Sequence, residues 1–178
     1  MLRRVFVMLI PAVAAAVLVG CGDSGGDHNA ADVTFATDMI PHHRQAVMMA
    51  ELAEARSDNS DVLELAAAIR DAQDPEIETM SGWLEDWDEP VPDEMDAMSG
   101  MDMPGMASDQ EMAEMEAASG TGFDELFLES MIAHHTGAVQ MAQTEQADGQ
   151  YAEAVDLAEQ IEQSQSVEIE TMEGLLQG

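Results

Sequence analysis

Residues 39–50 read Met-Ile-Pro-His-His-Arg-Gln-Ala-Val-Met-Met-Ala, and residues 131–142 read Met-Ile-Ala-His-His-Thr-Gly-Ala-Val-Gln-Met-Ala. Around the first stretch, apolar residues and one histidine recur at steps of three and four from Phe35 to Ala53, which places them on one face of a helix. The second stretch repeats this spacing. Each stretch therefore predicts an amphipathic helix whose apolar face carries histidine and methionine.

The two stretches belong to a duplicated unit. Residues 35–84 align without a gap on residues 127–176, with about 21 of 50 positions identical. A second shared block, Gln-x-x-Glu-Ile-Glu-Thr-Met, begins at Gln73 and again at Gln165 and lies on a second apolar stripe. Each copy predicts a helical hairpin, with helices at 32–56 and 61–86 in the first and at 122–147 and 151–176 in the second. Two hairpins packed face to face predict an all-α, ferritin-like four-helix bundle.

Local signals refine the ends of these helices. Residues 57–60, Ser-Asp-Asn-Ser, predict a turn and a helix cap, and Thr121 with Asp124 resembles a capping box. Pro41 and Pro75 lie inside helical patterns and lack the N–H that a helix interior needs, so each predicts a kink or a late helix start. The second copy has no proline at either position, so the two hairpins should differ locally.

The charge of the chain excludes one class of function. It carries 37 acidic and 5 basic residues, no lysine, and a formal charge of -32. Binding to nucleic acid requires Lys and Arg to neutralise phosphates, so a nucleic-acid-binding function is excluded. An acidic surface attracts cations, although it is equally typical of a solubility adaptation.

The N-terminus has the features of an exported lipoprotein. Residues 1–20 combine two arginines with a short apolar run and predict a signal peptide. The run ends in Leu-Val-Gly-Cys, which resembles a bacterial lipobox, so we expect Cys21 to be lipidated and residues 21–31 to form a flexible tether. A plain secretory signal and an uncleaved anchor are the alternatives. The sequence thus predicts a protein at the outer face of the bacterial cell membrane or in the periplasm.

An acidic, methionine-rich insert, residues 89–120, separates the hairpin repeats at 32–88 and 121–178. It has no apolar stripe to bury, so we expect it to stay loose apart from a short helix near 108–118. Closely spaced methionines on a flexible chain can gather around a soft metal ion, although low-complexity drift would produce the same composition. The predicted weak capture residues are Met95, Met98, Met101, Met103 and Met106.

The helical stripes direct histidine and glutamate into an otherwise apolar core, where both are costly unless paired or bound to an ion. Thioether and imidazole together favour copper, especially Cu(I), and by extension Ag(I). The predicted metal ligands are Met39, His42, His43, Met49, Met80, Met131, His134, His135, Met141 and Met172. Four further polar residues would orient these ligands or neutralise the ion: Gln73, Glu76, Gln165 and Glu168.

Two other interpretations compete with copper binding. In the first, the polar side chains only hydrogen-bond across the core of a structural or partner-binding lipoprotein. In the second, the bundle is a metal-dependent redox enzyme. Iron is less favoured, because di-iron bundles place Glu three residues before each ligating His, whereas this chain has Met or Ile there. No nucleophile motif or phosphate loop predicts another catalytic site.

The repeated motif Met-Ile-x-His-His-x-x-Ala-x-x-Met-Ala, followed by Gln-x-x-Glu-Ile-x-x-Met, resembles the bacterial domain-of-unknown-function family 305. The resemblance covers the chain outside the leader, tether and insert, and both copies keep the full motif. It implies a ferritin-like bundle, export, and copper handling outside the cytoplasm. We therefore expect an extracytoplasmic, lipid-anchored protein that sequesters copper or passes it to a transfer partner.

Overall fold

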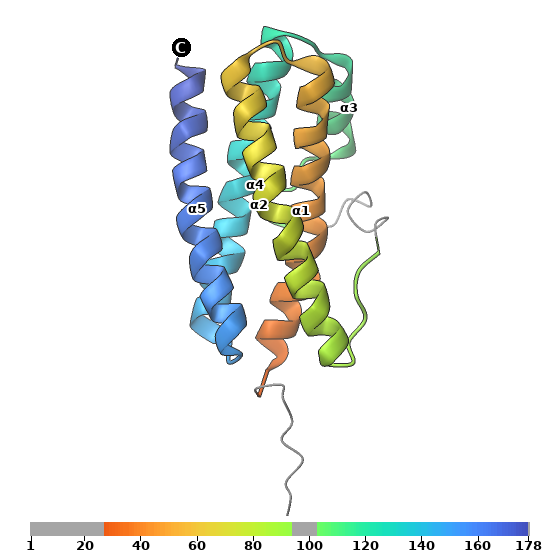
Figure 1. The fold of residues 1–178 in the computed structure, drawn as a ribbon, viewed down its shortest axis with the longest axis vertical. Coiled ribbons are helices and arrows are strands. Elements are labelled where there is room, and N and C mark those ends of the chain that lie inside the picture. Colours follow the sequence, from red (N-terminus) through yellow and green to blue (C-terminus); the bar gives the residue numbers. More distant parts are fainter. Residues whose placement is uncertain (1–26, 94–102, 178) are drawn as a thin grey trace, which may run out of the picture.

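The computed structural model describes residues 27–93 and 103–177. Within these ranges the chain forms no β-strand and five helices: α1 (Ala30–Arg56), α2 (Ser60–Asp86), α3 (Asp109–Ala117), α4 (Thr121–Asp148) and α5 (Ala152–Leu176). The four long helices run alongside one another, and the short α3 packs on the outside of the bundle (Figure 1). The predicted four-helix bundle built from two hairpins is confirmed.

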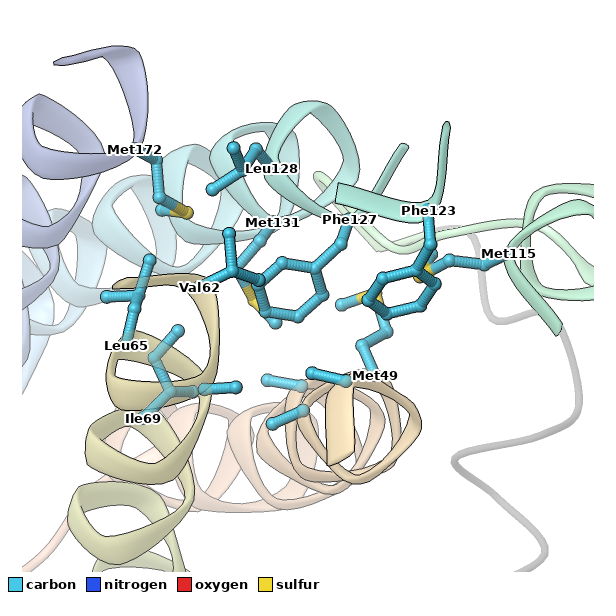
Figure 2. Close-up of a cluster of buried hydrophobic side chains, with 14 of the residues drawn as sticks. Met49, Val62, Leu65, Ile69, Met115, Phe123, Phe127, Leu128, Met131 and Met172 are labelled. Carbon is cyan, nitrogen blue, oxygen red and sulfur yellow. The ribbon is translucent and has the colours of Figure 1, made fainter. Parts of the chain in front are cut away.

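The two hairpins pack against each other through their first helices. Within the hairpins, α1 packs against α2 and α4 packs against α5. The contacts between the hairpins are mainly those between α1 and α4. Two apolar clusters fill the interior. Figure 2 shows the one at the α3 end, where Phe123 and Phe127 stack with ring centroids 5.7 Å apart and Met115 reaches in from α3.

The helix ends follow the local sequence only in part. Asn29 caps α1, and Asn59 caps α2 as predicted, each accepting from backbone N–H groups of the first turn. Both helices continue through Pro41 and Pro75, so a late helix start at either proline is wrong. Each proline follows several helical turns whose apolar side chains are already buried, and this packing outweighs the loss of one backbone hydrogen bond.

The capping box predicted at the start of α4 does not form. Gly120 is the N-cap and provides no side-chain hydrogen bond. Asp124 instead accepts a hydrogen bond from Ser57 Oγ at 2.5 Å, in the loop between α1 and α2. Asp32, the equivalent residue of the first repeat, accepts from the backbone N–H groups of Gln150 and Tyr151 at 2.9 Å each, in the loop between α4 and α5. In each repeat an acid of the first turn therefore binds the loop of the other hairpin.

Glu145 lies buried beside Asp32 at this junction. It is 1% exposed, and neither of its carboxylate oxygens receives an N–H or hydroxyl hydrogen bond. Burial, reinforced by the side chain of Asp32, raises the pKa of Glu145 from 4.5 to about 8. Burial also opposes ionisation of Asp32, but its hydrogen bonds outweigh this effect and lower its pKa from 3.8. These pKa shifts favour a protonated Glu145 beside an ionised Asp32 at neutral pH.

The second half of the insert is packed rather than loose. The predicted short helix is present as α3. The side chain of Met115 on this helix is fully buried, and Ala107, just before it, is 9% exposed. A nine-residue acidic helix that buries one methionine produces no visible apolar stripe. For this reason the composition of the insert did not reveal that its second half packs on the bundle. Three of the predicted capture residues, Met95, Met98 and Met101, lie outside the described residues.

The predicted signal peptide and the predicted lipidation site Cys21 also lie outside the described residues. α1 begins at Ala30, so it includes the last two residues of the segment that we expect to form a tether. Among the helices that the structure describes, none is long and apolar enough to cross a membrane.

Candidate metal centre

Four buried histidines meet at mid-height of the bundle. His42 and His43 come from α1, His134 and His135 come from α4, and all four are 0% exposed. The rings of His42 and His134 lie against each other, with centroids 3.7 Å apart and planes tilted by 38°. The helical stripes of both repeats therefore direct their histidines to the same layer of the core, between the two apolar clusters.

Each repeat supplies one glutamate that binds its own histidine. Glu76 Oε2 lies 2.7 Å from His43 Nε2, and Glu168 Oε2 lies 2.6 Å from His135 Nε2. Both glutamates are 20% exposed, so they lie at the edge of the core rather than in its middle. An ionised carboxylate can only accept, which places a proton on Nε2 of each ring, and in the neutral imidazole Nδ1 then carries the lone pair.

His42 is held by the insert. Its Nε2 lies 3.1 Å from the backbone carbonyl oxygen of Pro104. A carbonyl can only accept, so this hydrogen bond also requires the proton on Nε2 and leaves the lone pair on Nδ1. In the part of the chain that the structure describes, His134 has no hydrogen-bond partner of good geometry on either ring nitrogen.

The layer contains several buried polar atoms without a hydrogen-bond partner among the described residues. Gln73 and Gln165 are 2% and 3% exposed and do not close a network with the histidines. The atoms concerned are Nδ1 of all four histidines, Nε2 of His134, both amide atoms of Gln73 and Oε1 of Gln165. Native cores rarely leave such groups together, because each costs about 1–3 kcal/mol.

Burial keeps the central pair of imidazoles neutral. Burial first, and then the neighbouring His43, lower the pKa of His42 from 6.5 to about 3, against the opposing effect of the Pro104 carbonyl. Burial and the nearby histidines likewise lower the pKa of His134 well below 6.5. Neutral imidazoles carry the lone pair that a metal ion needs.

The six predicted core methionines divide into two groups of three. Met39 and Met80 are fully buried in the cluster towards the start of α1, and the half-buried Met141 packs against them. The other group, in the cluster at the α3 end, comprises Met49, Met131 and Met172. Figure 2 shows Met131 and Met172 beside Phe127 and Leu128. The histidine layer thus lies between two sets of thioethers.

Comparison with known proteins agrees with this architecture. Residues 32–176 match the family described as Domain of unknown function (DUF305). The chain belongs to the DUF305 family. A DUF305 protein from Streptomyces coelicolor, described as secreted, is 37% identical over 82% of this chain and 91% of its own, with a TM-score of 0.75. A DUF305 fragment from Deinococcus radiodurans is 33% identical over 85% and 98%, with a TM-score of 0.76.

A metal-bound relative has the same fold. CopM in its Cu(I)-bound form is 31% identical over 82% of this chain and 95% of its own, with a TM-score of 0.68. CopM has also been solved with Cu(II) and with silver. Comparison with curated proteins finds no match.

The described part of this DUF305 bundle contains no preformed metal site built from His, Cys, Asp and Glu alone. Among the described residues, no three His, Cys, Asp or Glu side chains converge so that they could hold a metal ion. Each glutamate is already bound to a histidine, and the Pro104 carbonyl engages His42. Any ion in this layer would therefore take imidazole together with thioether, or draw the rings together by small rotations.

Three residues of this layer escape prediction from the sequence: Gln45, Pro104 and Gly137. They contribute no ligand type: Gln45 and Gly137 occupy a variable position of the repeated motif, and Pro104 lies in the insert. Gln45 and Gly137 occupy equivalent positions in the two repeats, and this difference between otherwise similar motifs is the signal that marks them. Met103 and Met106 are half-buried on either side of the Pro104–Gly105 pair.

Proposed function

We propose that this DUF305 protein binds copper in the histidine layer, with the flanking methionines as additional ligands. The carrying observation is the set of unpartnered ring nitrogens on His42, His43, His134 and His135 in a water-excluded core. A bound cation would satisfy these lone pairs together and remove a cost of about 1–3 kcal/mol for each. The hydrogen-bonded core interpretation leaves that cost in place.

The chemistry of the layer favours a soft ion. Nδ1 of His43 and His135 would ligate, while Glu76 and Glu168 hold the opposite nitrogen of each ring and increase its basicity. Two groups of thioethers above and below favour Cu(I) and Ag(I) over zinc or iron. The copper and silver complexes of CopM support this assignment.

We further propose that the protein works outside the cytoplasm, held by a lipid on Cys21. The leader sequence and the resemblance to a protein described as secreted support this location. There the bundle would sequester copper or pass it to a protein partner, with the insert methionines as weaker capture sites. The acidic surface would raise the local concentration of cations.

The experiment that tests copper binding exposes the purified protein in parallel to Cu(I), Cu(II), Ag(I), Zn(II) and Fe(II). Metal content after desalting and the melting temperature are the readouts. An ion whose free concentration is about 100 times its Kd stabilises the folded protein by about 2.7 kcal/mol. This corresponds to a rise in melting temperature of roughly 5–10 °C for a domain of this size.

A double variant, His42→Leu with His134→Leu, removes the central pair while keeping the layer apolar, and circular dichroism checks that it stays helical. The control is His28→Ala, since His28 is exposed and stacks on Trp87 at the surface. Retention of Cu or Ag that the double variant loses and His28→Ala keeps would support the proposal. Equal retention by all three proteins would refute it, and retention of iron alone would favour the redox enzyme.

A further inference from the structure

The middle of the insert, at Pro104 and Gly105, fits between α1 and α4 at the level of the histidines. Gly137 on α4 has no room for a Cβ, because the Pro104 carbonyl occupies that space, and a Cβ at Gly105 would meet the backbone carbonyl of Ala133. Gly105 also has a φ of +80°, in the region that favours glycine. Two glycines on facing segments therefore permit a direct backbone-to-backbone approach.

A second set of contacts holds the insert against α1. The side-chain amide of Gln45, which is 5% exposed, accepts from the N–H of Ala107 at 2.7 Å and donates to its carbonyl at 2.9 Å. Arg44 donates to the carbonyl oxygens of Pro92 and Asp93 at 2.7 and 2.8 Å, near the start of the insert. The start and the middle of the insert are thus fixed to adjacent residues of α1.

The position of the Pro104 carbonyl matches a pattern within the site. Three of the four buried imidazoles direct Nε2 towards a fixed acceptor: Glu76 for His43, Glu168 for His135, and Pro104 for His42. In all three, Nδ1 is buried without a partner. The carbonyl therefore does for His42 what a carboxylate does for its neighbours.

We propose that Pro104 is a positioning residue of the metal centre: its carbonyl, held by the fit against Gly137 and the clamp on Gln45, fixes the His42 ring for metal binding through Nδ1. The insert then completes the site rather than only collecting ions around it. This inference rests on the proposed copper binding, but its central claim concerns the protonation of one ring and can be tested without metal.

The test compares Gly137→Ala with Gly174→Ala. Both glycines lie inside long helices, but a Cβ at Gly174 meets nothing within 4 Å, so this control carries the same chemical change without displacing the insert. The first readout is the tautomer of His42, from the ring ¹⁵N signals of the metal-free protein. We expect a single Nε2–H form in wild type and the control, and a mixture of tautomers in Gly137→Ala.

The second readout is the affinity for Ag(I), measured with the ion alone. Loss of an outer partner of a ligating histidine weakens metal binding by about 10–100-fold, and we expect a loss of this size in Gly137→Ala only. If Gly137→Ala fails to fold, Gln45→Ala releases the same segment from α1 and should give the same shifts.

Unchanged His42 signals and unchanged Ag(I) affinity in a folded Gly137→Ala or Gln45→Ala would overturn the inference. If wild type retains neither silver nor copper, the proposed function fails, whereas the tautomer comparison still decides whether Pro104 fixes the ring.

Discussion

Replacing Glu145 by Gln should stabilise the bundle at pH 8 and change its stability little at pH 5. Glu145 is 1% exposed beside Asp32, and its pKa is raised from 4.5 to about 8. A folded pKa above the unfolded value means that the native state keeps a proton that the unfolded chain releases. The stabilising contribution is therefore complete below pH 4.5 and is lost as the pH rises towards 8.

The size of the effect follows from the same two pKa values. Each pH unit between them removes about 1.4 kcal/mol of stability, so wild type should lose on the order of 3 kcal/mol between pH 5 and pH 8 through this group. Gln is neutral at both pH values, and its amide N–H can donate to Asp32 as a protonated Glu145 would. The variant should therefore escape this loss.

Urea unfolding of both proteins at pH 5 and pH 8 measures the difference directly, because other titrating acids affect wild type and variant alike. Glu125→Gln is the control, since Glu125 is an exposed acid on the same helix. A stability difference between Glu145→Gln and wild type that is the same at both pH values would refute the raised pKa of Glu145.

Three further predictions concern the core and the metal centre. Phe127→Ala should cost about 3–5 kcal/mol in urea unfolding, since Phe127 is fully buried, whereas a cost below about 1 kcal/mol would contradict the packing at the α3 end. The double variant Met131→Leu with Met172→Leu should lose less than about 3 kcal/mol of unfolding free energy but bind Ag(I) more weakly. The control Met48→Leu, at a half-buried surface position, should bind Ag(I) as wild type does. Because burial lowers the pKa of His42 to about 3, its ring ¹⁵N signals in the metal-free protein should be the same at pH 7 and pH 5, and a change with a midpoint near pH 6.5 would show that the ring titrates freely.

The sequence predicted the structure correctly where burial requires apolar side chains to recur at a regular spacing. The step of three and four residues in α1 and α4 predicted both helices and the inward direction of His42 and His134, because a side chain on an apolar stripe must share its environment. The stripe also predicted that Glu76 points towards the histidines. It could not predict that Glu76 binds His43 rather than a histidine of the other hairpin, since that choice depends on how α1 and α2 cross.

The insert was the main failure of sequence analysis. Its docking depends on the absence of side chains at Gly105 and Gly137 and on one amide clamp from Gln45, none of which produces a periodic pattern. Asp124 shows the same limit on a smaller scale. Its spacing from Thr121 fits a cap, but Ser57, 67 residues earlier in the chain, offers a buried hydroxyl that competes for the carboxylate.

The duplication and the insert together explain why the two halves of the centre are no longer equivalent. Duplication supplies two His-His pairs and two glutamates, and these are arranged alike in both repeats. Among the described residues the insert makes a hydrogen bond to one of the central rings, His42: Gln45 holds the insert on α1, and the aligned Gly137 makes room for it on α4. His42 consequently has a fixed orientation, whereas its equivalent His134 has no hydrogen bond of good geometry at either nitrogen among the described residues and only the backbone of His42 as a weak partner. A ring that is packed but weakly hydrogen-bonded rotates at a lower cost, so we expect His134 to be the histidine that moves if an ion enters the layer.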